Sequence, residues 1–339
     1  MSRRPTVSVL ITVHNRERLI EDAIRSSLAQ TMSDLEVIVV DDGSIDGTAS
    51  VVESIDDPRL KLIRHSCNQG IPAARNSALD EASGEYVAWL DSDDLSRPDR
   101  LERQLLYLRA NPSVAMVGSC AGKLLEDGTR KLGIRVPPLA HDDIRCWLLF
   151  RSAFQQSSVF GRREILRRYP YRAEFPVCED VDMFVRLSAE HQVANLPEVL
   201  IDRRLHPGQT IRHNRDLIVD AQSSISAPLL DAAGVQYNAE DLRRHVLLGG
   251  SFDFRPDAEY LAWVSNWLSK LIVANDASEM FDRGSLRLCA SFLWIRACGR
   301  ASNRAHGTSK LFSSRLTPGI ISSHGRAWLS EALPLMRRG

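Results

Sequence analysis

Three aspartates stand directly after a short apolar segment, residues 86–90. Asp91 and Asp93 are two positions apart, and Asp94 follows at once. Carboxylates this close repel each other unless a cation neutralises them. Because Mg²⁺ is usually held by one or two carboxylates together with substrate phosphates, the spacing indicates a metal–diphosphate site. The alternative is a plain strand end, followed by a helix that Ser96 caps.

Two earlier polar segments could serve the same ligand. Asp41 ends the apolar segment 36–41, where it could hydrogen-bond a ribose or a base, although Asp-Gly steps also make ordinary turns. The Gly-containing loop 68–70 enters a predicted helix and places Arg75 about one turn in. An arginine there could reach a phosphate or an acidic neighbour, or it could form a surface salt bridge.

The elements that must position these residues alternate between strands and helices. Residues 7–13 and 36–41 are apolar and rich in β-branched side chains, and 60–64 is a weaker third strand. Apolar faces with helical spacing lie between them, over 19–28 and 71–82. This alternation predicts an α/β fold with a mostly parallel, doubly wound sheet, whose ligand sites lie at the C-terminal ends of the strands.

Together these segments resemble the family 2 glycosyltransferases, an inverting group with the GT-A (nucleotide-diphospho-sugar transferase) fold. The resemblance rests on four segments, 9–15, 39–48, 68–76 and 84–94, which follow one another with the order and spacing of the family. It reaches from residue 6 to about residue 210 and leaves the last third of the chain without a template.

The resemblance implies which residues hold the donor nucleotide. By position, Thr12, His14 and Asp41 would hold the nucleoside. Arg75 would lie nearby, and Asp91 would face the ribose or the diphosphate. The family usually has a tyrosine where this chain has His14, and a histidine can still stack on or beside the base.

The resemblance also implies a divalent metal, Mg²⁺ or Mn²⁺. Asp93 is the second acid of the D-x-D element and would be its ligand. Residues 204–206 resemble a late Tyr-Arg-x-His element whose histidine lies near the diphosphate or the metal. His206 is therefore a second candidate ligand, although Arg203 replaces the aromatic residue.

Residues 178–187 look like the acidic element that opens a helix in this family. The resemblance makes Asp180 the general base, which would take the proton of the attacking acceptor hydroxyl. Glu179 and Asp182 are rival candidates, because only one of the three need face the cleft. The alternative is that these acids simply complement the helix dipole. Residues 155–159, in a predicted strand over 157–160, are a candidate acceptor contact.

Length and composition are those of a globular protein of one or two domains. We expect a catalytic domain over 1–212, with a nucleotide-sugar half to about residue 95 and an acceptor half from about 96, then a helical extension over 213–282 and a basic tail over 283–339. No signal peptide or membrane-spanning run is visible, and six scattered cysteines favour a reducing cytoplasm.

The net charge of zero hides an asymmetry, because 283–339 holds ten basic residues and one acidic residue. With its aromatic residues, this tail would suit an anionic membrane surface, so we expect a cytoplasmic protein that can lie peripherally on the membrane. The acidic remainder argues against nucleic acid as a partner. A merely solvated basic tail is the alternative.

We therefore expect a metal-dependent, inverting transfer of one sugar from a nucleotide diphosphate donor, a UDP-sugar by preference. The acceptor would be a glycan or a lipid-linked molecule in cell-surface polysaccharide synthesis. Single-residue transfer is favoured because the chain has no Q-x-x-R-W element and no membrane spans. The alternatives are a sugar-nucleotide pyrophosphorylase and a catalytically silent nucleotide-sugar-binding or scaffold protein.

Overall fold

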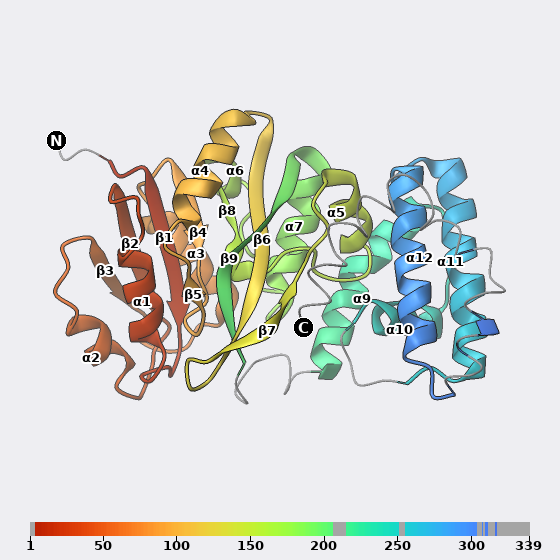
Figure 1. Ribbon diagram of the computed structural model, residues 1–339, viewed down its shortest axis with the longest axis horizontal. Coiled ribbons are helices and arrows are strands. Elements are labelled where there is room, and N and C mark those ends of the chain that lie inside the picture. The colour runs from red at the N-terminus through yellow and green to blue at the C-terminus, as the bar shows by residue number, and fades with distance from the viewer. Residues whose placement is uncertain are drawn as a thin grey trace. The chain divides into compact units, whose positions relative to one another are not determined.

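The computed structural model describes residues 4–205, 215–250, 255–303, 307, 309–310 and 316. The chain divides into two compact units (Figure 1). The first takes its residues mainly from 1–141 and 154–213, and the second mainly from 142–153 and 214–337. The short segment 142–153 therefore leaves the first unit and joins the second.

The first unit is built on one sheet, in which the strands have the order β3-β2-β1-β4-β8-β6-β9-β5 and β7 pairs with β6. Its described strands are β1 (Val7–Val13), β2 (Leu35–Asp41), β3 (Leu60–Arg64), β4 (Tyr86–Trp89), β5 (Leu95–Ser96), β6 (Val114–Leu125), β7 (Arg130–Arg135), β8 (Phe160–Arg162) and β9 (Gln192–Leu205).

Strand direction divides this sheet into two parts. β1 runs parallel to β2 and β4, and β2 runs parallel to β3. β8 is antiparallel to both β4 and β6, whereas β6 and β9 are parallel. The predicted parallel, doubly wound arrangement is thus the β3-β2-β1-β4 part, and the remainder of the sheet is mixed.

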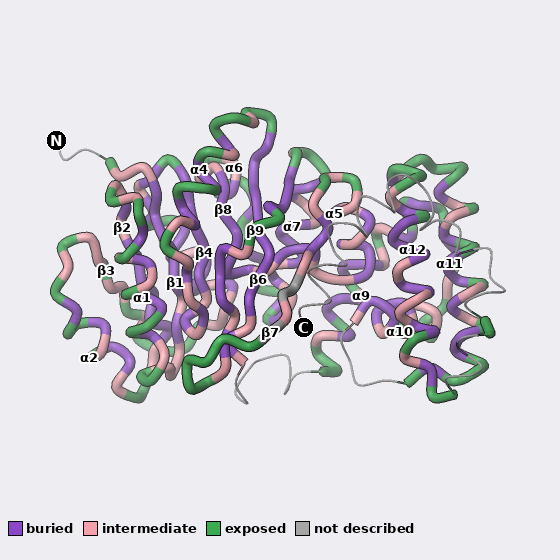
Figure 2. Tube along the Cα trace, in the orientation of Figure 1, coloured by how far each residue is buried: buried purple, intermediate pink, exposed green. Residues whose placement is uncertain are grey.

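The helices of the parallel part form because their apolar positions recur with helical spacing. They are α1 (Ile20–Leu28), α2 (Thr48–Glu53) and α3 (Ile71–Glu81). In α1, for example, Ile20, Ala23, Ile24 and Ser27 are buried, which is the i, i+3, i+4, i+7 stripe of an amphipathic helix. Buried residues of β1, β2 and β4 complete this core (Figure 2).

The second half of the first unit adds α4 (Arg100–Ala110), the single 3₁₀ turn η1 (Gln156–Ser158), α6 (Arg163–Leu166) and α7 (Glu179–Glu190). The predicted strand over 157–160 is wrong. Residues 156–158 instead form η1, closed by a hydrogen bond from Ser158 N to Gln155 O (2.8 Å), and β8 begins only at Phe160.

The second unit is helical. Its described helices are α5 (His141–Leu148), which begins at the boundary, α9 (Arg215–Ala232), α10 (Ala239–Gly249), α11 (Ala258–Ser278) and α12 (Arg283–Gly299). The side chains of Asn238, Asp257 and Asp282 cap the starts of α10, α11 and α12. No helix among the described residues is both long and apolar enough to cross a membrane.

Helix α12 contains the first residues of the segment that we expected to be a basic tail. Its Leu293 and Trp294 are each 1% exposed and belong to the core of the second unit, with Trp267 and Leu268 of α11. These aromatic and aliphatic side chains are therefore used for packing. Phe312 and Trp328, also expected in the tail, lie outside the described residues.

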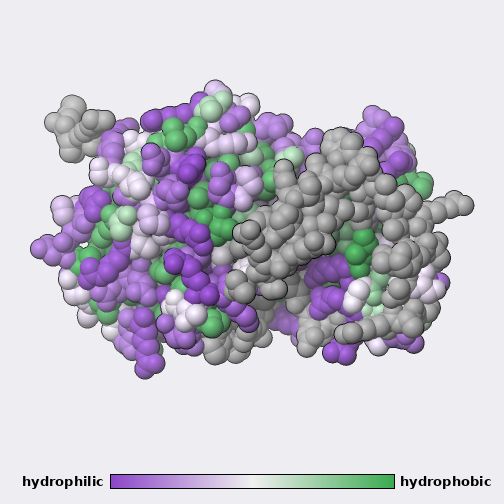
Figure 3. Space-filling view, in the orientation of Figure 1, coloured by the Kyte–Doolittle hydropathy of each residue, from purple (hydrophilic) through white to green (hydrophobic). Residues whose placement is uncertain are grey.

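The described surface of the first unit mixes polar and apolar side chains. On the face shown in Figure 3 it is mainly hydrophilic, with smaller apolar areas between. Two exposed apolar residues are Ile45, in the connection between β2 and α2, and Leu106 of α4. Scattered apolar side chains of this kind are ordinary on protein surfaces.

Candidate active site

The C-terminal ends of β1, β2 and β4 meet at one edge of the sheet. In the register of the parallel strands, Val13 of β1 lies opposite Asp41 of β2, and Leu10 lies opposite Trp89 of β4. The ends of parallel strands are where open α/β sheets bind ligands. This edge thus brings Asp41 next to Thr12 and His14.

Asp41 is fully buried and only partly satisfied. Its Oδ1 accepts a hydrogen bond from Ser44 N (2.9 Å). No described residue donates a hydrogen bond to Oδ2, and Arg64 Nε lies 3.9 Å from it. A buried carboxylate oxygen without a hydrogen-bond donor is costly, so Oδ2 is suited to accept from a ligand such as a base or a ribose.

His14 is fixed by both of its ring nitrogens. Nδ1 is 2.9 Å from Asp42 O, and Nε2 is 3.1 Å from Asn15 Nδ2. A carbonyl can only accept, so Nδ1 carries the proton and Nε2 accepts from the amide. A contact between His14 and a nucleobase would therefore use the face of the ring.

Asp42 organises the loop that leads to Arg75. Its two carboxylate oxygens accept from the backbone nitrogens of Gln69 and Gly70, each at 2.9 Å, and Oδ1 also contacts His65 Nδ1 at 2.7 Å. Sequence analysis did not single out this residue. The only signal was its place as the second acid of an Asp-Asp-Gly step.

Arg75 links the donor edge of the sheet to the start of α7. Its Nη2 lies 3.5 Å from Asp91 Oδ1 and 3.3 Å from Glu179 Oε1. The guanidinium also lies over the rings of Trp89 and Tyr171, at 5.7 and 5.4 Å. Burial opposes its charge, but the surrounding acids, Glu179 foremost, raise the pKa of Arg75 above its ordinary value. The predicted alternative of a surface salt bridge does not hold, because Arg75 is buried.

The D-x-D loop crowds its carboxyl groups together. Partial burial and the charge of Asp93 raise the pKa of Asp91, while Arg75 opposes the rise. Burial, followed by the charges of Asp93 and Asp91, raises the pKa of Asp94 well above its ordinary value. A divalent cation would relieve this crowding, because it favours the ionised carboxylates.

Ser157 of η1 holds two of these carboxyl groups. Its Oγ is 2.9 Å from Asp91 Oδ2 and also hydrogen-bonds to Asp94 Oδ2. One hydroxyl donates only one proton, so the second contact requires a proton on a carboxyl group, which agrees with the raised pKa of Asp94. The segment 155–159, which we expected to contact the acceptor, therefore supports the D-x-D loop through Ser157.

The metal prediction concerns a site that the substrate would complete. The described residues contain no group of three or more His, Cys, Asp or Glu side chains that could hold a metal ion. The two D-x-D carboxylates nevertheless fit Mg²⁺ or Mn²⁺, which take one or two protein carboxylates and complete their coordination with phosphates and water. His206, the second candidate ligand, lies outside the described residues.

The three acids at the start of α7 have different partners. Asp182 Oδ2 accepts from Arg172 Nε (3.0 Å) and from Arg186 Nη2 (2.7 Å). Glu179 is buried against Arg75, and burial raises its pKa to about 7 although that arginine opposes the rise. Asp180 is half-buried and has no salt bridge to a described residue. Of the three, Asp180 is the one that no described arginine holds.

Arg100 is a buried support that sequence analysis missed. It is fully buried, and its Nη2 donates to Trp89 O (2.8 Å) and Val159 O (3.2 Å), at the end of β4 and beside η1. Burial lowers the pKa of Arg100 to about 9. The spacing of Arg100 along the chain could have shown this. Arg100 and Gln104 fall on the apolar face of α4, together with Leu101, Leu105 and Leu108, and this position predicts that they are buried.

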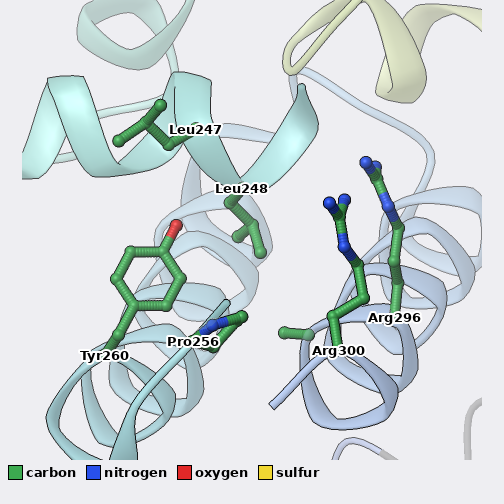
Figure 4. A pocket seen from close by; sticks show the side chains of 7 residues that line it. Leu247, Leu248, Pro256, Tyr260, Arg296 and Arg300 are labelled. Atoms are coloured by element: carbon green, nitrogen blue, oxygen red, sulfur yellow. The ribbon is translucent and has the colours of Figure 1, made fainter. Parts of the chain in front are cut away.

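A separate pocket lies in the second unit (Figure 4). Its described lining consists of Leu247, Leu248, Pro256, Tyr260, Arg296, Ala297 and Arg300. Arg296 donates to the carbonyls of Gly249 (3.0 Å) and Gly250, at the C-terminal end of α10, where a cation stabilises a helix. None of these described lining residues carries a carboxylate, an imidazole or a thiol, so the strand edge of the first unit is the better candidate active site.

Known proteins share both the sequence and the fold. Glycosyl transferase family 2 matches residues 8–169. An uncharacterised glycosyltransferase of Haemophilus influenzae is 32% identical over 221 residues, which cover 62% of this chain and 68% of that protein. The amylovoran biosynthesis glycosyltransferase AmsE of Erwinia amylovora is 29% identical over 203 residues, 58% of this chain and 75% of AmsE. In two further curated relatives the match spans about half of the relative's length.

Two solved structures have the same fold. Residues 1–349 of TarS from S. aureus, in complex with UDP-GlcNAc, give a TM-score of 0.56 at 17% identity over 91% of this chain and 92% of that one. The mannosyltransferase PcManGT of Pyrobaculum calidifontis, in complex with GDP-Man and Mn²⁺, gives 0.53 at 19% identity over 98% and 86%. At these identities the likeness establishes the fold alone.

The sheet, with acidic residues gathered at its strand ends, places the chain in the class of proteins with the GT-A fold. Within that class, the chain belongs to glycosyltransferase family 2. It is therefore an enzyme that transfers a sugar, and the pyrophosphorylase alternative is set aside.

Proposed function

We propose that this enzyme transfers a single sugar, with inversion and with the help of Mg²⁺ or Mn²⁺, from a UDP-sugar to a glycan or lipid-linked acceptor in the synthesis of a cell-surface polysaccharide. One observation carries the proposal. The buried guanidinium of Arg75 lies within 3.5 Å of both Asp91, the first acid of the D-x-D element, and Glu179, the neighbour of the candidate base. The donor side and the base side of one site are thus joined by one side chain.

Each group has a task in this proposal. Asp41 Oδ2, with Thr12 and the ring face of His14, binds the nucleoside. Asp93 holds the cation, which when bound offsets the charge of the departing diphosphate, and Asp91 lies on the ribose or diphosphate side. Asp180 accepts the proton of the acceptor hydroxyl as that oxygen attacks the anomeric carbon.

The named relatives support the donor class and the biological setting. AmsE is named for amylovoran biosynthesis, and TarS and PcManGT bind UDP-GlcNAc and GDP-Man in their crystals. A UDP-sugar is proposed over a GDP-sugar on the resemblance of the motifs. The acceptor class is inferred from the named relatives, and the transfer of a single sugar is inferred from the absence of a Q-x-x-R-W element in the sequence.

Donor hydrolysis tests the proposal without knowledge of the acceptor. The purified full-length chain is incubated with a panel of UDP-sugars and with GDP-mannose, either with Mn²⁺ or with EDTA. We expect Mn²⁺-dependent release of UDP from at least one α-linked UDP-sugar, and ¹H NMR should show the β-anomer of the free sugar first. Release of the α-anomer would contradict inversion, and equal rates in EDTA would contradict metal dependence.

The same assay separates the enzyme from a silent scaffold protein. A scaffold binds UDP in calorimetry but hydrolyses no donor, and Asp180→Asn leaves its behaviour unchanged. The proposed enzyme loses hydrolysis in Asp180→Asn and keeps UDP binding.

A further inference from the structure

Arg204, near the end of β9, contacts three other segments of the first unit. Its side chain is only 4% exposed. Nη2 pairs with Asp22 Oδ2 on α1 (2.8 Å), Nη1 donates to Glu126 O beyond β6 (3.3 Å), and Nε donates to Asp93 O in the D-x-D loop (3.0 Å). Sequence analysis gave Arg204 no role of its own.

The contacts of Arg204 with the D-x-D loop involve both main chain and side chain. Its backbone nitrogen donates to Asp94 Oδ1 (2.9 Å), and its Nε holds the carbonyl of Asp93. On the other side of Asp94, Oδ2 bonds to Ser157. Asp94 is thus held from β9 and from η1, so it is a support of the loop rather than a third ligand.

The choice of atoms on Asp93 has a chemical consequence. Arg204 Nε donates to the main-chain carbonyl of Asp93, so this bond fixes the backbone of the residue and does not itself occupy the carboxylate that a cation would bind. A fixed guanidinium donates several hydrogen bonds in one plane, which a lysine ammonium cannot reproduce. The buried, positively charged guanidinium of Arg204 also lies next to the crowded carboxyl groups of the D-x-D loop, and its charge helps to neutralise theirs.

We infer that Arg204 is a positioning residue, which holds Asp93 and Asp94 in the arrangement that a divalent cation and a diphosphate require. The inference rests on the metal dependence proposed above. Asp22, whose side chain is 56% exposed, is the outer anchor of this arrangement, because its pairing orients the guanidinium. Residues that orient metal ligands typically change metal affinity about 10–100-fold when replaced.

A neighbouring ion pair offers a matched control. Asp202, also on β9 and buried, pairs with Arg130 at 2.9 Å on the hairpin strand β7. Replacing Arg130 removes an arginine–aspartate contact of the same strand, and this contact involves no atom of the D-x-D loop. Asp202 keeps its second partner, Arg97 (2.8 Å), so Arg130→Gln removes one arginine contact of β9 and leaves the contacts of Arg204 in place.

The test measures UDP binding to the full-length protein by calorimetry, with Mn²⁺ and with EDTA. The variants are Arg204→Lys, Asp22→Asn and Arg130→Gln, and circular dichroism checks that each is folded. We expect Mn²⁺ to strengthen UDP binding in the wild type and in Arg130→Gln alike. In Arg204→Lys that gain should fall about 10-fold or more, with the affinity in EDTA unchanged, and Asp22→Asn should show a smaller loss in the same direction.

The outcomes separate this inference from the proposed function. If Mn²⁺ does not strengthen UDP binding in the wild type, metal dependence is wrong and the inference falls with it. If Mn²⁺ strengthens UDP binding in the wild type and does so equally in a folded Arg204→Lys variant, the inference alone is overturned. An equal loss of affinity in EDTA also overturns it, since the nucleotide site as a whole would then be disturbed. If Arg204→Lys does not fold, Asp22→Asn decides, and an unchanged Mn²⁺ gain in that variant overturns the inference.

Discussion

At the start of α7, three neighbouring acids have surroundings that suit them to different tasks. Two arginines hold Asp182, and Arg75 holds Glu179, whereas Asp180 has no salt bridge to a described residue. Cys178, just before them, has a left-handed backbone (φ 61°), a strained conformation that is common near functional sites. A carboxylate that is already paired is a poor base, so the contacts favour Asp180.

Asp180→Asn should lower the rate of transfer, or of donor hydrolysis, by about 10²–10⁴-fold while UDP affinity stays unchanged, because only the proton acceptor is lost. Asp182→Asn is the matched change two residues away. It removes the partner of two partly exposed arginines, so it should lower the free energy of unfolding by about 2 kcal/mol and have a smaller effect on the rate. Steady-state kinetics and thermal melts of both variants check this. If Asp182→Asn instead lowers the rate as much as is expected for Asp180→Asn, with an unchanged melting temperature, Asp182 is the base.

The residues that sequence analysis could find are those that carry a local pattern. Asp41, Asp91 and Asp93 each follow an apolar strand, and the structure places the first two at the sheet edge as expected. Asp42 and Arg204 could not be found in this way, because their partners lie 27 and 111 positions away in the sequence. A support residue is recognised by contacts that only the folded chain brings together.

At the scale of elements, the turn after β2 depends on one glycine. Gly43 has φ +69°, and a Cβ there would lie 2.4 Å from the carbonyl carbon of Cys67 and 2.6 Å from Asn68 N. The turn after Asp41 and the loop that leads to Arg75 therefore pack backbone against backbone. No side chain fits between them without moving one of the two segments.

Gly43→Ala should cost about 3 kcal/mol in unfolding free energy, from the left-handed backbone and the steric clash together, and it should weaken UDP binding. Gly128→Ala is the matched control. It also has a positive φ (+83°) but nothing within 4 Å of the added carbon, so it should cost only about 1 kcal/mol and leave UDP binding unchanged. Thermal melts and calorimetry measure both quantities. Equal effects of the two substitutions would show that the close approach at Gly43 does not matter.

Element prediction succeeded where a long pattern existed and failed where the pattern was short. The helix that we expected to begin at the acidic element 178–187 is α7, because its apolar positions recur over three turns. The strand predicted over 157–160 is largely the turn η1, since four residues cannot distinguish a buried strand from a buried turn. Strand β6 has its partner far away in the sequence, because β9 pairs with it as far as Leu125.

At the scale of the whole molecule, the second unit contains a buried histidine that should make its stability depend on pH. His245 Nε2 is 2.8 Å from Leu149 O, and Nδ1 accepts from Trp267 Nε1 (3.0 Å), so the neutral ring is fully satisfied. Burial lowers the pKa of His245 to about 4. In the unfolded chain this histidine has its ordinary pKa of about 6.5. Below that pH the unfolded chain binds a proton at His245, whereas the folded unit does not bind it until the pH approaches 4.

The contribution of neutral His245 to the free energy of unfolding is therefore complete above about pH 6.5, and it is lost as the pH falls toward 4. At pH 5 the loss should be about 2 kcal/mol relative to neutral pH. His245→Gln can make the same two hydrogen bonds without titrating, so it should show a weaker dependence on pH. Thermal melts followed by tryptophan fluorescence suit this test, because Trp267 and Trp294 lie in the second unit. Identical pH dependence of wild type and variant would show that His245 is not responsible.

The basic segment 283–339 is not a uniform tail. In α12, Arg283 pairs with Glu279 (2.7 Å), Arg287 pairs with Asp276 (3.3 Å), and Arg296 is bound to carbonyls of α10. These three cations are already engaged within the second unit. Peripheral membrane binding, which stays a prediction, therefore has to come from the basic residues nearer the C-terminus.

Full-length protein should cosediment with anionic vesicles at low salt and be released at high salt, because each basic residue near the surface contributes about 1 kcal/mol that salt screens. Truncation after Leu316 removes Arg326, Arg337 and Arg338 but keeps α12 and the buried Leu316, so it should weaken vesicle binding and leave UDP binding unchanged. Truncation after Asp282 would instead expose the core around Trp294 and should cause aggregation. If the full-length protein does not cosediment with anionic vesicles at low salt, the prediction of membrane binding is wrong and a soluble glycan becomes the better candidate acceptor.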